Sequence, residues 1–126
     1  MNDLSQLIYD LEILNRDYSA LSKWAFSQTK EDIKKEEERY IKGEKLLIDF
    51  YNNVFIPEYL KSAEIPKNVL DKVEEYLAYL SSTASRLIKE KNFFGLGVLL
   101  IDRKTRDGEY NLKKLIQDLK KTYLTS

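Results

Sequence analysis

The chain contains no cysteine and no histidine among its 126 residues. Without thiols it can form no disulfide and offers no thiol nucleophile, and without imidazoles it lacks the usual acid–base group of neutral pH. Zinc sites of the cysteine and histidine type are excluded. Di-iron helical bundles are excluded too, because their Glu-x-x-His motif requires histidine. We therefore expect no catalytic residues, no metal site and no cofactor, and a protein that is not an enzyme.

Proline, glycine and long apolar runs are also scarce, with two prolines and four glycines. The longest nearly apolar run, residues 93–101, is too short to span a bilayer as a helix. The first residues carry no basic segment of the signal-peptide kind, so we expect a cytoplasmic protein that does not enter a membrane. Abundant Lys and Glu are seen in hyperthermophile proteins, but AT-rich genomes also favour Lys, so a thermophile origin is one of two interpretations of this composition.

Net charge is zero, but the charges are unevenly distributed along the chain. Residues 1–85 carry 11 basic and 16 acidic side chains, whereas residues 86–126 carry 10 basic and 5 acidic ones. Such a division indicates either an anionic partner at the basic end or two helical ends that attract each other.

Two stretches repeat apolar residues at alternating spacings of three and four. The first comprises Leu4, Leu7, Leu11, Leu14, Tyr18, Leu21 and Ala25, and the second comprises Leu70, Val73, Leu77, Leu80, Ala84 and Leu87. This alternation keeps an apolar seam on one side of a helix, where another helix packs lengthwise. It predicts long helices over about 3–26 and 66–91.

The predicted first helix carries a second apolar stripe, which includes Tyr9, Ile13, Ala20 and Trp24, opposite its seam. Two opposed stripes indicate packing on both sides of a helix. Two interpretations stay open. Either later helices of the same chain cover this stripe, or Tyr9, Ile13 and Trp24 form an interface with a partner, since aromatic residues often anchor interfaces.

Residues 29–32 resemble a capping box, with Thr29 as N-cap and Asp32 in place of the usual Glu. They predict a second helix from Lys30 to about Phe55, which forms a hairpin with the first helix or continues it. Twelve of the sixteen residues from 30 to 45 are charged, so we expect this half to be solvated and the second half to be buried.

Pro57 is expected to open a single turn after this helix, with Tyr59 exposed. Residues 93–106 are apolar all round and predict a buried fourth helix, with a buried strand as the alternative for 97–101. Asp107-Gly108 is a stop signal, and residues 111–123 predict a fifth helix. The expected fold is one all-α domain over 1–126, an antiparallel bundle of three long helices plus two shorter C-terminal helices.

Two groups of charged residues are candidate binding sites. Asp71, Glu74 and Glu75 share helical spacings that suit Mg²⁺, but a metal-dependent hydrolase needs a second acidic cluster facing them. The C-terminal basic set would contact an anion or a nucleic acid if the ends of its helices converge. Its members are Arg103, Lys104, Arg106, Lys113, Lys114, Lys120 and Lys121.

The leading functional hypothesis from sequence is a non-enzymatic helical interaction protein, a small subunit, adaptor or regulator that binds another protein or a second copy of itself. It rests on the second apolar stripe of the first helix. The alternative is a nucleic-acid-associated protein that uses the basic set.

Overall fold

The computed structural model describes residues 3–90 and 110–124, which are helical almost throughout and contain no strand. Its elements are α1 (Leu4–Ser27), α2 (Lys30–Lys35), α3 (Glu37–Asp49), η1 (Phe50–Tyr59), α4 (Lys67–Glu90), α6 (Leu112–Leu119) and η2 (Lys120–Leu124), of which η1 and η2 are π-helical. The all-α class is confirmed. The predicted fourth helix, 93–106, lies outside the described residues, so the complete five-helix arrangement stays a prediction.

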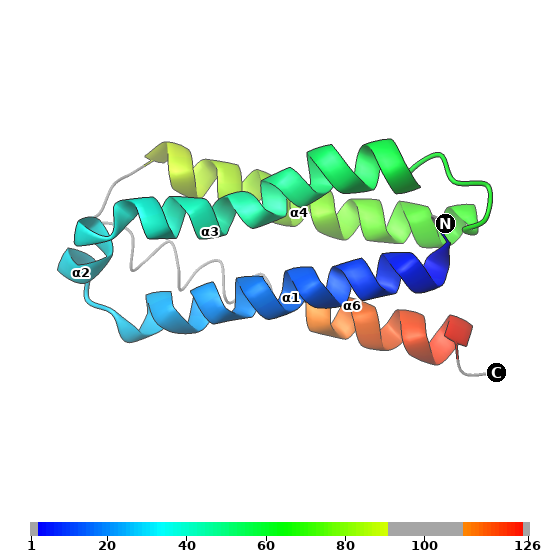
Figure 1. Cartoon of the computed structure of the whole chain (residues 1–126), viewed down its shortest axis with the longest axis horizontal. Coiled ribbons are helices and arrows are strands. Elements are labelled where there is room, and N and C mark those ends of the chain that lie inside the picture. The colour runs from blue at the N-terminus through cyan, green and yellow to red at the C-terminus, as the bar shows by residue number, and fades with distance from the viewer. Residues whose placement is uncertain (1–2, 91–109, 125–126) are drawn as a thin grey trace.

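The long helices lie side by side, and α3 runs back along α1 (Figure 1). α3 packs against α1 and α4, and α6 also packs against α1 and α4. α1 and α4 therefore each have α3 on one side and α6 on another, and the core lies between the four helices. The long axis of the molecule follows the helices (Figure 1).

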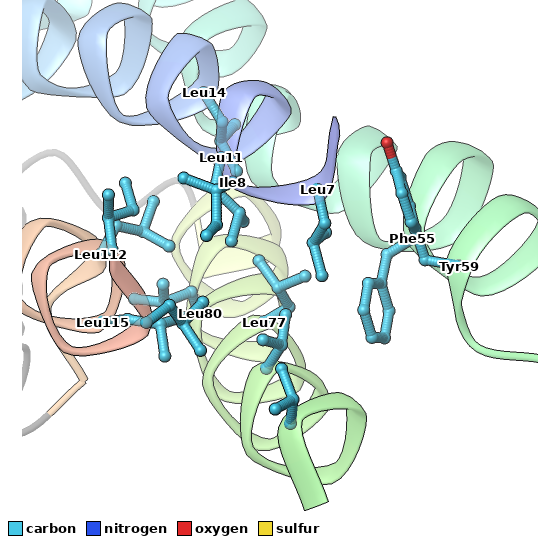
Figure 2. Packing of buried hydrophobic residues seen from close by; sticks show 14 of the residues in the cluster. Leu7, Ile8, Leu11, Leu14, Phe55, Tyr59, Leu77, Leu80, Leu112 and Leu115 are labelled. Carbon is cyan, nitrogen blue, oxygen red and sulfur yellow. The ribbon is translucent and has the colours of Figure 1, made fainter. Parts of the chain in front are cut away.

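The core consists of the two predicted seams, the inner face of α6, and buried residues of α3 and η1 such as Leu47 and Phe55. Leu7, Leu11 and Leu14 of α1 are buried, as is the whole second stripe on α4. Figure 2 shows α1 leucines pointing toward Leu77 and Leu80 of α4 and toward Leu115 of α6. Both heptad patterns thus mark the buried sides of their helices, as predicted.

The capping box at the start of α2 is confirmed, and it produces a hairpin rather than a continuous helix. The Thr29 hydroxyl accepts a hydrogen bond from the backbone N–H of Asp32 at 3.1 Å, and the Asp32 carboxylate accepts one from the Thr29 N–H at 3.3 Å. Hydrogen bonds from Thr29 hold the pKa of Asp32 below its usual value. α1 ends at Ser27, so the chain reverses within a few residues.

The single helix predicted for 30–55 is wrong, because the structure divides this stretch into α2, α3 and η1. Glu36 leaves the helical region, with φ −111° and ψ 39°. From Phe50 the turns widen, and Leu60 N–H donates to the Phe55 carbonyl five residues back. Pro57 lies inside η1 instead of opening a separate turn. Proline lacks an N–H and clashes with the carbonyl four residues back in an α-helix, and a wider turn relieves that clash.

The expectation of a solvated stretch over 30–45 is also wrong in part. Ile33, Tyr40 and Glu44 are buried, and Ile33 and Tyr40 form a second apolar cluster with Leu21 and Ala25 of α1. The Tyr40 hydroxyl donates to the Glu44 carboxylate at 3.2 Å inside the protein. Burial of the phenol next to this carboxylate raises the pKa of Tyr40.

Gly43 explains how α3 approaches α1 closely. A Cβ at this position would lie only 2.5 and 2.7 Å from the two Cδ atoms of Leu21. The glycine therefore has a packing role in addition to its unfavourable effect on helix propensity.

The C-terminal elements agree with the predicted fifth helix, except that its last turns are wider. Asn111 caps α6, because its side-chain oxygen accepts from the N–H groups of Lys113 and Lys114. The helix then continues as η2. Within 3–90 and 110–124, no helix has both the length and the apolar character needed to cross a membrane.

Candidate functional site: an acidic groove beside the exposed face of α1

A groove of about 480 Å³ runs between α1 and the wall made by α3 and η1, and we call it the acidic groove. Its lining residues come from both sides: Asp10, Ile13, Leu14 and Asp17 from α1, and Leu46, Asp49, Phe50, Asn53, Val54 and Glu58 from α3 and η1. The spacings of three and four on each wall place these residues on one side of each helix. The groove is therefore a direct consequence of the α1–α3 hairpin.

Apolar side chains from both walls form the floor of the groove. Ile13, Leu46, Phe50 and Val54 are each only partly buried, so each leaves some apolar surface in contact with solvent. Leu14, by contrast, belongs to the core and closes the groove from below. Concave surfaces with an apolar floor and a few charged groups are typical of binding sites.

The rim of the groove is acidic. Four of its ten lining residues are Asp or Glu, and none is Lys or Arg. Asp49 and Glu58 are exposed on the α3–η1 wall, and Asp17 is exposed on α1. The local potential is accordingly negative, and it favours cationic groups in a bound molecule.

One of the four carboxylates, that of Asp10, is held by a hydrogen bond that joins the two walls of the groove. The hydroxyl of Tyr59, on η1, donates to Oδ2 of Asp10, on α1, at 2.5 Å, and the Gln6 amide donates to Oδ1 at 3.0 Å. Burial and the hydrogen bond to Asp10 raise the pKa of Tyr59. Tyr59 is almost fully buried, so the prediction that it would be exposed is wrong.

The three predicted interface residues of α1 do not form one surface. Tyr9 is 60% exposed, and Ile13 follows one turn later in the groove floor. Trp24 lies at the other end of α1, where it packs against the second apolar cluster. The guanidinium carbon of Arg39 lies 4.6 Å from the centre of the Trp24 ring. α3 thus partly covers Trp24, and Tyr9 and Ile13 stay available.

The described members of the basic set lie on α6 and η2. Lys113, Lys114 and Lys121 are exposed, and the Lys120 ammonium pairs with Glu12 of α1 at 2.8 Å. Lys113 and Lys120 also line a smaller hollow of about 220 Å³ between α1 and α6, together with Arg16. Arg103, Lys104 and Arg106 lie outside the described residues, so the convergence of the full set stays a prediction.

The acidic residues weighed as metal ligands are not joined by a second acidic cluster in the part of the chain that the structure describes. Glu75 instead accepts a hydrogen bond from the Tyr110 hydroxyl at 3.5 Å. Tyr110 also stacks on Tyr79, with ring centroids 4.4 Å apart, so Tyr79 is half-buried.

No family model, curated protein or solved structure matches the chain. The groove and the exposed face of α1 therefore provide the structural basis for a functional proposal. The sequence predicted Tyr9, Ile13 and Trp24 as interface residues, but the second wall of the groove was not predicted. Its signal is present in the sequence: the apolar residues Leu46, Phe50 and Val54 share helical spacings with the acidic residues Asp49 and Glu58.

Proposed function

We propose that this chain, as an antiparallel bundle of three long helices plus two shorter C-terminal helices, is a non-enzymatic interaction protein. Its binding surface is the outer face of α1 at Tyr9 together with the floor of the acidic groove. The observation that carries this proposal is the exposure of Tyr9, 60%, one helical turn from a groove floor of partly exposed apolar side chains. Exposed aromatic residues next to concave apolar surface are typical of interface anchors.

The proposal covers both a different protein and a second copy of the chain as partner. Affinity capture from extracts of the source organism, combined with light scattering of the purified protein, separates the two. Tyr9→Glu adds a charge at the centre of the proposed surface, and Ser85→Glu is the matched control, because Ser85 is exposed on α4 away from the groove. We expect Tyr9→Glu to abolish capture or self-association, and Ser85→Glu to leave it unchanged.

A monomer in light scattering that captures no protein in these extracts would contradict the proposal. Loss of binding in both variants would contradict the assignment to α1. Thermal melting of each variant shows that the loss is not caused by unfolding, since both positions are exposed and substitution there changes stability little.

A second candidate function is association with nucleic acid through α6 and η2. It is supported by the three cationic side chains that line the α1–α6 hollow, Arg16, Lys113 and Lys120. Two of them are already paired with carboxylates, Arg16 with Asp17 and Lys120 with Glu12, which reduces their attraction for phosphate. A gel-shift assay at low salt tests this function. Binding that weakens steeply with salt would support it, and absence of binding would remove it.

A further inference from the structure

We propose that the acidic groove binds an amphipathic helix of a partner protein whose apolar ridge is flanked by Lys or Arg. This inference rests on the proposed function and adds the chemistry of the partner. It is carried by three properties of the groove: its shape between two helices, its partly exposed apolar floor and its acidic rim.

The shape of the groove suits a helix. On α1 the lining residues extend from Asp10 to Asp17, which is about 10 Å or two helical turns at 1.5 Å per residue. A third helix lying along two neighbouring helices presents residues i, i+3 or i+4 and i+7 over the same length. The floor side chains, Ile13 from α1 and Leu46, Phe50 and Val54 from the other wall, would receive such a ridge.

The negative charge of the rim favours a partner helix with positive charge. Asp17 lies on one wall and Asp49 and Glu58 on the other, so carboxylates face the groove from both sides. None of the lining residues is Lys or Arg, although Arg16 pairs with Asp17 at 3.1 Å, so the carboxylates of Asp49 and Glu58 on the other wall contribute most to the negative charge. A helix with cationic residues on both sides of its apolar ridge places each cation beside a carboxylate, whereas a polyanion is repelled.

Among the described elements, α6 of a second copy is a poorer occupant. The exposed lysines of α6 would suit the rim, but the apolar residues of that helix, including Leu112 and Leu115, are buried in its own core. The described part of α6 therefore offers the charge without the apolar ridge. A helix from a different protein satisfies both requirements.

The test measures binding of two labelled model peptides to the full chain by fluorescence anisotropy. One is an amphipathic peptide of Leu and Lys, about 14 residues or four helical turns long, and the other replaces every Lys by Glu. We expect the Leu/Lys peptide to bind and the Leu/Glu peptide to bind at least about tenfold more weakly. Binding of the first should weaken as salt is raised, because rim charges are screened.

Two pairs of variants locate the site. Asp17→Lys with Asp49→Lys reverses one carboxylate on each wall, and Glu64→Lys with Asp71→Lys makes the same charge change at exposed positions outside the groove. Ile13→Ser removes part of the floor, and Ile88→Ser is its control on α4. We expect each groove variant to weaken the Leu/Lys peptide at least about tenfold relative to its control.

Three results would overturn the inference: no binding of the Leu/Lys peptide at low salt, equal binding of the two peptides, or equal effects of groove and control variants. The proposed function is tested by a different experiment, namely capture of a partner and the effect of Tyr9→Glu on that capture. A chain that captures a partner through Tyr9 and ignores the Leu/Lys peptide would retain the proposed function and lose this inference.

Discussion

At the residue scale, the least expected feature is the buried carboxylate of Glu44, 1% exposed, with the Tyr40 hydroxyl as a donor. Burial of a charged group is unfavourable unless hydrogen bonds compensate it. We expect Tyr40→Phe to lower the free energy of unfolding by about 1–3 kcal/mol, because it removes a hydrogen-bond donor to the buried Glu44 carboxyl group. Urea denaturation measures this. Tyr9→Phe is the control and should change stability by less than about 0.5 kcal/mol; equal losses would show that the bond contributes nothing.

The two buried tyrosines also make stability depend on alkaline pH. The folded-state pKa values of Tyr40 and Tyr59 are raised above 10, so the folded protein holds these protons more tightly than the unfolded chain does. Their contribution is complete below pH 10 and is lost as the pH rises toward the folded-state values. Melting temperature should therefore fall above pH 10, and less steeply in the Tyr40→Phe, Tyr59→Phe variant. An identical decline in both proteins would contradict this origin.

Residue-scale errors of the sequence interpretation have a common cause. Tyr59 was expected to be exposed and Tyr40 to lie in a solvated stretch, yet both are buried with their hydroxyls bound to carboxylates, Asp10 and Glu44. Tyr59 and Asp10 are 49 positions apart in the sequence. Tyr40 and Glu44 are four positions apart and lie in a stretch rich in charged residues. Local charge density predicts solvation, but it does not reveal which polar groups satisfy each other after the helices have packed.

At the element scale, α1 and α3 are in close contact because of Gly43. Gly43→Ala gains about 1 kcal/mol of helix propensity but forces a methyl group against Leu21, and overpacking of this kind costs about 1–3 kcal/mol. We expect a net loss of stability in the wild-type background. In a Leu21→Ala background the same substitution should be stabilising, because the opposing side chain is gone. A double-mutant cycle measures this coupling. Additive effects would contradict the close approach.

At this scale, the features that could be predicted from the sequence are those determined by residues close together in the chain. The bounds of α1 and α4, the seam on each and the capping box at Thr29 were predicted, because periodicity and capping act within a few residues. The irregularity at Glu36 and the wide turns of η1 were missed. Pro57 is a local signal for the wide turns of η1, because proline is incompatible with a regular α-helical interior, but it was expected to open a separate turn. The acidic groove was not predicted: of its lining residues only Ile13 was named as an interface residue, since the second wall comes from α3 and η1.

For the whole molecule, the seams of α1 and α4 determine whether the bundle forms at all. Leu14 and Leu77 are 5% and 1% exposed, so Leu14→Glu or Leu77→Glu places an unpaired charge in the core. We expect either variant to unfold the chain or to destabilise it by at least several kcal/mol. Circular dichroism melting measures this, with Tyr9→Glu as the exposed control. A small shift in melting temperature would show that the seam is not core.

For the whole molecule, α3 and α6 pack against α1 while Tyr9 of α1 stays exposed, and we propose that this exposed side binds a partner. Site-specific photo-cross-linking tests it most directly, with a benzophenone amino acid in place of Tyr9 or, as a control, of Ser85. We predict a discrete cross-linked adduct from position 9 in extracts of the source organism or with a second copy, and none from position 85. No adduct from position 9, or equal adducts from both positions, would contradict the claim.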